Sequence, residues 1–582
     1  MRSSSSVAEP GPLITLDLRD PHRHLVSVTI RFQPSGERQR LCLPSWTPGS
    51  YLIRDYVRHL EDLQLEQAGR PLPLRRTGVA RWIVHPAGTA PVLVRYRILA
   101  ADPSVRTCDL DDEHAFLALA AVVLEVEGQR WRPHRLMVQL PEGWQSFVSL
   151  PSCADGGWLA SDFDHLIDSP LSAGAHPSHT FAVAGVPHQW VSRGGDLPVR
   201  DPSWLADVER IALTCCRLMG VNAPASDSYL FVLNLIEQGY GGLEHDHGCV
   251  LQYGRLALAR PNGRRKLLQL VAHEYLHQWN VRRLRPAELT PIDYSQPAIV
   301  PSLWFAEGVT SYFDMLIPVA AGICDEASLL EDLGGELSRY RLTPGRFVQS
   351  LKSSSEEAWV KLYRQDAFSA DNQISYYLKG SVLALILDLH LRRHGSWLGA
   401  VLQDLWRSHG CHGRGYTSED LRAALSSRAA DLCERLPAWL ESTEDPDLEG
   451  YLADLGLVLE ADVAAGPNAG WQLELQNGTV QLRRVVRDGA AERAGLRPGD
   501  EVLAVEGRRI RQPEDLPLLW PAPPESEQPW PAVDLVSVRD GRLRTSRLEP
   551  GPPVVERWRL VAKQEVRPEE LERRRRWCSL IP

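Results

Sequence analysis

Short runs of alternating apolar and polar residues dominate the first third of the chain. Residues 25–32 (LVSVTIRF) and 92–98 (VLVRYRI) alternate in this way, and glycine and proline residues separate such runs. Alternation with a period of two predicts strands that bury one face. We therefore predict an N-terminal antiparallel β domain over residues 1–190.

The apolar spacing becomes helical further along the chain. Residues 229–236 (YLFVLNLI) predict a buried strand, helical patterns dominate from 264 to about 445, and residues 381–391 (SVLALILDLHL) predict a buried helix. After residue 446 the pattern changes to strand, short helix, a turn (AGLRPGD) and strand. The fold class is therefore multidomain α+β, with boundaries at 1–190, 191–445, 446–562 and a charged tail at 563–582.

Composition limits the class of protein. A chain of 582 residues is too long for one hydrophobic core, and 43% hydrophobic with 24% charged residues is ordinary for globular proteins. The net charge of −10 gives no electrostatic reason to expect nucleic acid. The N-terminus has no apolar signal region, no apolar run reaches the ~18 residues of a membrane span, and the ten cysteines form no CxxC pair. We expect a cytoplasmic protein with reduced thiols, and a solvated, salt-bridged helix for the basic run 573–576.

Residues 271–280 (VAHEYLHQWN) carry the most informative motif. On a helix, His273 and His277 share one face and can bind one metal ion, and Glu274 can act as general base on a metal-bound water. A catalytic zinc needs a third protein ligand. Glu307 is the candidate, because an unpaired carboxylate among its apolar neighbours would be costly. We predict one Zn²⁺ on His273, His277 and Glu307, with solvated helix carboxylates and histidines as the alternative.

Residues near the motif leave several alternatives open. Thr310 and Asp314 follow Glu307 on its helical face, and either could orient a ligand histidine. His245 and His247 could suggest a second metal, although a hydrogen-bonded strand edge is the favoured reading.

The longer string at 273–286 (HEYLHQWNVRRLRP), followed by 304–310 (WFAEGVT), resembles the glycyl-aminopeptidase family of gluzincin zinc peptidases. Residues 44–51 (PSWTPGSY) resemble the N-terminal signature of that family, residues 240–245 (YGGLEH) its substrate-binding strand, and the C-terminal region its PDZ domain. The resemblance implies a thermolysin-like catalytic domain, made of an α/β lobe and a helical lobe. It also implies that 44–51 borders the active site.

The resemblance extends to individual roles. In similar aminopeptidases the tyrosine of a Tyr-x-Lys-Gly stretch stabilises the oxyanion. The resemblance therefore implies this role for Tyr377, and the adjacent Tyr376 is the other candidate. The alternative is that both tyrosines are only part of the hydrophobic core. Gly241 and Gly242 would let a substrate backbone approach closely. Glu244 would bind a free α-ammonium group, or else pair with an arginine.

The C-terminal region resembles a PDZ domain, which binds an extended peptide as an added strand and holds its carboxylate on backbone N–H groups. The predicted carboxylate loop is Leu455, Gly456 and Leu457.

The leading functional hypothesis is a zinc aminopeptidase that removes small N-terminal residues, glycine or alanine, by glutamate-assisted attack of zinc-bound water. Its expected partners are peptides with a free N-terminus, and peptide C-termini at the PDZ domain. One alternative is an endopeptidase of the same fold with PDZ-recruited substrates. Another is an inactive peptide-binding scaffold, against which the intact set of His273, Glu274, His277 and Glu307 argues.

Overall fold

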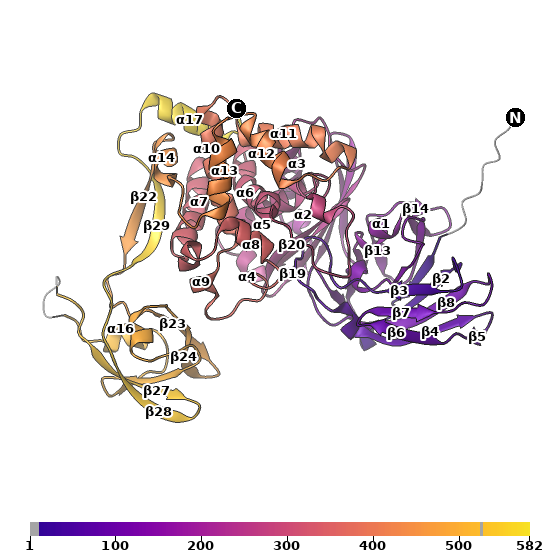
Figure 1. Cartoon of the computed structure of the whole chain (residues 1–582), viewed down its shortest axis with the longest axis horizontal. Helices are drawn as coiled ribbons and strands as arrows, with labels where there is room; N and C mark the ends of the chain where they lie inside the picture. Colours follow the sequence, from indigo (N-terminus) through magenta and orange to yellow (C-terminus); the bar gives the residue numbers. More distant parts are fainter. Residues whose placement is uncertain (1–10, 524–527, 582) are drawn as a thin grey trace. The chain divides into compact units, whose positions relative to one another are not determined.

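The computed structural model describes residues 11–523 and 528–581, which form two compact units that interleave along the chain (Figure 1). The first unit takes up the chain to Val300, together with Thr310–Cys324 and Ser396–Arg428. The second takes up Pro301–Val309, Asp325–Gly395 and the chain from Ala429 onward. None of the helices in these residues is both long and apolar enough to span a membrane, and all ten cysteines are free.

The first unit begins with the predicted β region. Its largest sheet has the order β14-β15-β12-β1-β2-β8-β4-β5, and every neighbouring pair is antiparallel except β1 and β12, which run parallel. Buried and exposed positions alternate along β2 and β8, as the sequence predicts. The strands are β1 (Leu13–Asp17), β2 (Leu25–Phe32), β4 (Leu60–Gln67), β5 (Arg70–Pro71), β8 (Val92–Leu99), β12 (His134–Gln139), β14 (Ser152–Cys153) and β15 (Gly157–Ala160).

Two four-stranded sheets complete this β region, with the orders β13-β16-β10-β9 and β11-β3-β7-β6. Their strands are β3 (Gln39–Cys42), β6 (Leu74–Gly78), β7 (Arg81–Val84), β9 (Cys108–Leu110), β10 (His114–Leu117), β11 (Glu125–Val126), β13 (Gln145–Phe147) and β16 (Leu171–Gly174). Short helical turns join them: η1 (Pro21–Arg23), η2 (Tyr56–His59), η3 (Leu119–Ala121) and α1 (Phe163–Ile167).

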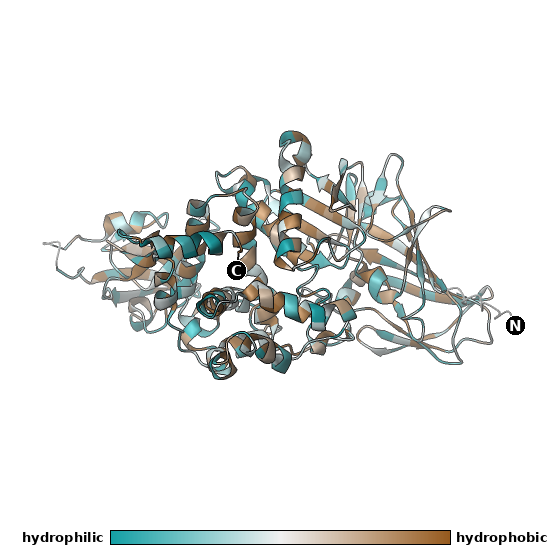
Figure 2. Ribbon diagram, turned by 90° about the horizontal axis from the view of Figure 1, so that it is seen from above, coloured by the Kyte–Doolittle hydropathy of each residue, from teal (hydrophilic) through white to brown (hydrophobic). Residues whose placement is uncertain are grey.

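A mixed five-stranded sheet with the order β17-β18-β19-β21-β20 follows in the same unit. Its strands are β17 (Ser178–Val183), β18 (Val186–Arg193), β19 (Tyr229–Ile236), β20 (Tyr240–His245) and β21 (Gly248–Gly254). Helix α5 (Gly263–Leu276), which carries the HExxH motif, packs against β20, β21 and α3 (Trp204–Leu218). Apolar residues of β19, β21, α3 and α5 are buried, and Figure 2 shows hydrophobic segments along both strands and helices of the chain. Strand β20 therefore forms the edge of the sheet beside the motif helix.

The helices after α5 belong partly to each unit. The remaining elements of the first unit are α2 (Leu197–Arg200), α4 (Arg255–Leu258), η4 (Ala287–Leu289), most of α6 (Val309–Ala320), α11 (Leu398–Ser408), η7 (Gly410–His412) and α12 (Ser418–Ser426). The second unit contains η5 (Trp304–Gly308), α7 (Glu326–Arg341), η6 (Pro344–Phe347), α8 (Leu351–Glu356), α9 (Ser369–Asn372), α10 (Tyr376–Arg393), α13 (Leu432–Glu441) and α14 (Leu448–Ala453). Nearly every residue of α10 is buried, which confirms the predicted core helix.

The PDZ region of the second unit is a sheet with the order β23-β24-β25-β27-β28, in which β26 pairs with β25. Its elements are β23 (Trp471–Gln476), β24 (Thr479–Val485), α15 (Ala490–Arg493), β25 (Glu501–Val505), β26 (Arg508–Arg509), α16 (Asp515–Leu519), β27 (Val533–Arg539) and β28 (Arg542–Leu548). A separate pair, β22 (Leu457–Val463) and β29 (Val555–Ala562), flanks it in sequence. Arg484 on β24 bonds Asp371 on α9 at 2.6 Å, so the PDZ sheet contacts the helical part of its unit.

The predicted PDZ carboxylate loop is wrong. Gly456 has a φ of +65° and follows the end of α14, where its amide donates to Ala453 O at 3.0 Å. It terminates a helix, a role that suits glycine because the left-handed conformation costs it little. Leu457 begins β22, which pairs with β29 and not with the PDZ sheet. The edge strands of that sheet are β23 and β28.

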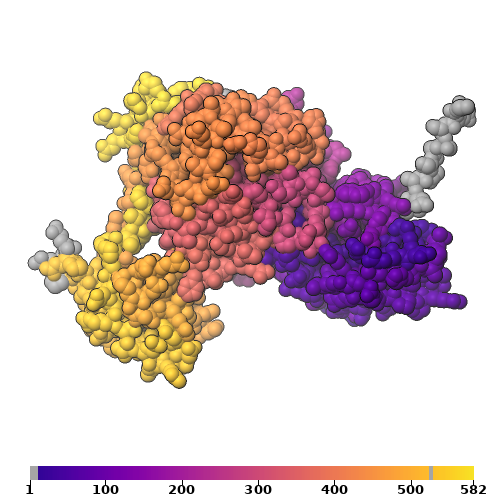
Figure 3. Space-filling view, in the orientation of Figure 1, coloured from indigo at the N-terminus to yellow at the C-terminus, as the bar shows by residue number. Residues whose placement is uncertain are grey.

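The charged C-terminal tail contains helix α17 (Pro568–Cys578), and only part of it is solvated. Trp577 is fully buried, and Arg574 pairs with Glu326 on α7 at 3.0 Å. Figure 3 shows the yellow surface of this segment against the orange helices of the same unit. The predicted solvated, salt-bridged helix is confirmed for Arg573, Arg575 and Arg576, which are exposed, whereas Arg574 is buried in its pair with Glu326.

Candidate active site

Helix α5 presents both histidines of the motif with their Nδ1 atoms already engaged. Nδ1 of His273 lies 2.9 Å from Oδ2 of Asp314, and Nδ1 of His277 lies 2.6 Å from the carbonyl oxygen of Asn280. Thr310 accepts a bond from the Asn280 side chain at 3.2 Å. Since Nδ1–H donates in each ring, Nε2 carries the lone pair that a metal needs. Of the two orienting residues that the sequence left open, Asp314 contacts a ligand histidine directly.

Glu307 lies on a single turn of π-helix, η5, which continues directly into α6. Its side chain is buried, and one carboxylate oxygen of Glu307 lies within 4.8 Å of a ring nitrogen from each of His273 and His277, which are within the same distance of each other. Two imidazole nitrogens and one carboxylate oxygen are the donors of a catalytic zinc site with an open fourth position. The three predicted ligands therefore converge, and their chemistry fits a zinc ion.

Two glycines hold the Glu307 turn close to α10. A methyl group on Gly308 would lie 2.6 Å from the backbone of Gly380, and one on Gly380 would lie 2.9 Å from the carbonyl oxygen of Trp304. Contacts this short exclude any larger side chain unless the backbone moves. The glycine that follows Glu307 and the glycine of the Tyr-x-Lys-Gly stretch thus make one close helix contact.

Strand β20 lies directly against the motif helix. A methyl group on Gly242 would lie only 2.0 Å from Oε1 of Glu274, so the strand backbone and the buried carboxylate are in contact. Glu244, two residues on, is also buried, and its carboxylate lies within 4.8 Å of both Glu274 and His277. Arg106 donates to the carbonyl oxygen of Gly242 at 3.2 Å. The predicted substrate strand and the general-base candidate are therefore neighbours.

The carboxylate of Glu244 has an incomplete set of partners. Among the residues that the structure describes, no donor reaches its buried Oε1 atom. Gly49, at a φ of +79°, comes so close that a methyl group there would lie 2.4 Å from Oε2. The segment 44–51 therefore borders the site, as the resemblance implies.

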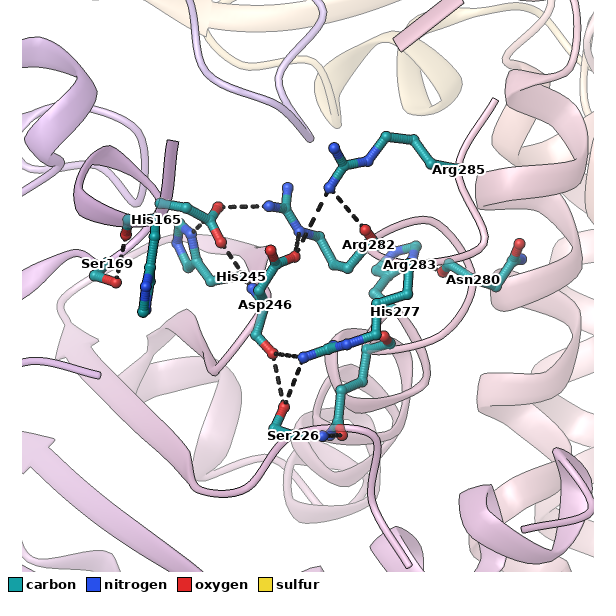
Figure 4. Close-up of polar contacts among 12 residues, drawn as sticks. His165, Ser169, Ser226, His245, Asp246, His277, Asn280, Arg282, Arg283 and Arg285 are labelled. Carbon is teal, nitrogen blue, oxygen red and sulfur yellow. Dashed lines mark hydrogen bonds and ion pairs between the residues drawn. The ribbon is translucent and has the colours of Figure 1, made fainter. Parts of the chain in front are cut away.

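A buried ion network fixes the turn after β20 to the chain after α5 (Figure 4). Arg282 bonds Asp246 at 2.8 Å and Asp168 at 2.7 Å, and Nδ1 of His245 lies 3.1 Å from Asp168. Arg283 donates to the carbonyl oxygen of Asp246 at 2.9 Å. Burial alone would raise the pKa of Asp246, but the surrounding arginines outweigh it and lower that pKa below 3.8. The network fixes the turn that follows Glu244 to the chain that follows the motif helix.

Tyr377 lies at the start of α10 and is half-buried, whereas its rival Tyr376 is fully buried. The hydroxyl of Tyr363 lies 3.2 Å from the hydroxyls of both. Burial lowers the pKa of Lys379 to about 8, and its ammonium donates to the carbonyl oxygens of Arg346 and Gln349 at 3.2 and 3.4 Å. In the Tyr-x-Lys-Gly stretch, the lysine thus anchors α10, and Tyr377 is the tyrosine with an accessible surface.

The sequence did not reveal the residues that hold other parts of the site in place. Asp168, Arg106 and Arg282 come from segments far apart in the chain, and only the run of arginines after the motif gave a signal for one of them. The alternative of a second zinc on His245 and His247 finds no support, since neither belongs to a metal-capable cluster of the described chain. Their Nδ1 atoms lie near Asp168 and Asp227 instead.

A helix with two histidines and an intervening glutamate, completed by a glutamate from a second helix, defines a metallopeptidase of the gluzincin type. The model of the peptidase M61 N-terminal domain matches residues 13–175, that of M61 glycyl aminopeptidase residues 266–383, and that of the PDZ domain residues 482–517. The chain belongs to the M61 glycyl aminopeptidase family.

Three solved structures are similar to this chain over much of its length. An aminopeptidase N family protein from Idiomarina loihiensis shares 29% identity at a TM-score of 0.89, with 96% of this chain and 99% of that chain covered. An M1 zinc metallopeptidase from Deinococcus radiodurans shares 14% identity at a TM-score of 0.47, with 75% and 95% covered. Yeast LTA4 hydrolase in complex with bestatin shares 14% at 0.47, with 75% and 68% covered. No curated protein matches the sequence.

Proposed function

We propose that this protein is a zinc-dependent aminopeptidase that hydrolyses the first peptide bond of peptides with a free N-terminus. The observation that carries the proposal is the convergence of His273, His277 and Glu307 within 4.8 Å, with both Nδ1 atoms engaged elsewhere. One Zn²⁺ held by these three residues would supply Lewis-acid chemistry, polarising the scissile carbonyl and lowering the pKa of a bound water.

The protein's own groups would move the proton and stabilise charge. Glu274 takes the proton from the attacking water and passes it to the departing amine. Its buried position beside Gly242 supports this role, because the carboxylate is held close to the substrate strand. The hydroxyl of Tyr377 donates to the oxyanion of the tetrahedral intermediate.

Strand β20 would align the substrate. It is the edge of its sheet, so the outer side of Gly241 and Gly242 has no neighbouring strand within the described chain, and an extended peptide can add there. Gly241 has open space around it, with Arg106 Nη1 at 3.9 Å as the nearest atom to an added methyl group.

Glu244 would set the cleavage position at the first peptide bond by binding the α-ammonium group of the substrate. Its buried Oε1 lacks a donor in the part of the chain that the structure describes, and a buried carboxylate is costly without a cationic partner. The α-ammonium group of a bound peptide is such a partner, and it would arrive beside Glu274, where the first peptide bond is cleaved. The preference for glycine or alanine rests on family membership, supported by the close approach of Gly49 to Glu244.

A panel of aminoacyl reporter substrates tests the proposal. We expect cleavage of glycyl and alanyl reporters, loss of activity with a zinc chelator, recovery on adding zinc, and no cleavage of the N-acetylated forms. Glu244→Gln should raise KM for free-amine substrates, because the cation loses its charged partner. Cleavage of N-acetylated peptides at rates equal to the free forms would instead favour the endopeptidase alternative.

A further inference from the structure

A second group of metal-capable side chains lies at the end of α10 away from Tyr377. His390 lies in the last turn of this helix, His394 four residues later is its C-cap, and Asp431 immediately precedes α13. The group belongs wholly to the second unit, and the proposed catalytic function makes no use of it.

The donor atoms of the three residues lie close together. Nε2 of His390 is 3.0 Å from Oδ1 of Asp431, and Nε2 of His394 is 3.9 Å from the same oxygen. The ring centroids of the histidines are 4.8 Å apart. Donors bound to one metal at about 2.1 Å lie roughly 3.0–3.4 Å from each other, so a modest rotation of the exposed His394 ring would complete the set.

Neighbouring residues hold the donors in orientation. Nδ1 of His390 lies 2.9 Å from the hydroxyl of Tyr451, which can fix the ring with Nε2 facing Asp431. Arg435 donates to the other carboxylate oxygen, Oδ2, at 2.7 Å and leaves Oδ1 for a ligand. The side chain of Arg435 is 54% exposed, so solvent screens its charge from an ion at Oδ1.

We propose that His390, His394 and Asp431 bind a divalent transition-metal ion of the Zn²⁺ type at a site separate from the catalytic centre. Two imidazoles and one carboxylate suit such an ion, and the exposure of His394 and Asp431 leaves room for water as the remaining ligand. The ion would link the C-terminal end of α10 to the start of α13. A simple hydrogen bond between His390 and Asp431 is the competing reading, and it leaves His394 without a function.

Binding of Zn²⁺ to the holoenzyme tests the site directly. Isothermal titration of the zinc-loaded full chain should show one further ion per chain, and His394→Ala should weaken this event by at least about tenfold. His22→Ala removes another exposed histidine, which belongs to no metal-capable cluster among the residues that the structure describes, and should leave the event unchanged. His394 is largely exposed, so its substitution should not disturb folding.

A thermal readout gives an independent check. Excess Zn²⁺ should raise the Tm of the wild type and of His22→Ala more than that of His394→Ala, because a ligand stabilises only the state that binds it. Tyr451→Phe should weaken the second event by about tenfold if that hydroxyl orients His390. Absence of a second event in the holoenzyme, or an equal event in His394→Ala, would overturn the proposal. The aminopeptidase proposal does not depend on either result.

Discussion

The substitution Gly242→Ala should disable the general base without removing it. The added methyl group would lie 2.0 Å from Oε1, 2.3 Å from Cδ and 2.6 Å from Cγ of Glu274. The three nearest atoms all belong to the flexible Glu274 side chain, which must therefore move. The matched substitution Gly241→Ala, one residue earlier on the same strand, meets only Arg106 Nη1 at 3.9 Å.

The size of the effect follows from the overlap. Restoring normal van der Waals contact requires the Glu274 carboxylate to move by about 1.5 Å. A misplacement of about 1 Å in a catalytic group can cost roughly 100-fold in rate. We therefore expect kcat/KM to fall by about 100-fold in Gly242→Ala, mostly through kcat, since the proton transfer is affected more than substrate binding.

Steady-state kinetics on an alanyl reporter, with zinc content and Tm measured in parallel, test this prediction. Gly242→Ala should retain zinc and lose less than about 1 kcal/mol of stability, because a flexible side chain accommodates the methyl group. Gly241→Ala should keep kcat within about threefold of the wild type, because its methyl group meets no atom of Glu274; an effect on substrate approach along β20 would fall on KM. Equal kcat values for the two variants would refute the placement of Glu274 against β20.

The remaining predictions concern stability. The pKa of Asp246 is lowered in the folded state, so its stabilising contribution is present above its unfolded pKa of 3.8 and is lost as the pH falls. Asp246→Asn should therefore lower Tm at pH 7. The difference in Tm between this variant and the wild type should narrow between pH 4 and pH 2. Gly308→Ala forces a methyl group onto the backbone of Gly380 and should cost about 1–3 kcal/mol in urea unfolding. Trp577→Ala should cost about 3–5 kcal/mol, whereas a freely solvated tail would show no change.

The motif at α5 allowed the ligand set to be predicted, because helical spacing alone places His273 and His277 on one face. Glu307 followed from its apolar surroundings, where a carboxylate needs a strong partner. The choice between Thr310 and Asp314 could not be made from sequence. It depends on how the two helices pack against each other. In the structure Asp314 is the hydrogen-bond partner of His273, and Thr310 is that of Asn280.

Long-range contacts account for the parts that sequence reasoning missed or misread. The network of Asp168, Asp246 and Arg282 joins three distant segments, and no local pattern encodes such an encounter. Gly456 was misread because a glycine between two leucines fits a carboxylate loop as well as a helix end, and only strand pairing distinguishes them.

The turnover of Glu274→Gln, measured with its metal content verified, tests whether Glu274 is the general base. The substitution preserves the shape of the side chain and removes its capacity to accept a proton. The variant should keep its catalytic zinc while kcat for a glycyl or alanyl reporter falls by about 10²–10⁴-fold. Turnover close to that of the wild type, with zinc in place, would contradict this role for Glu274.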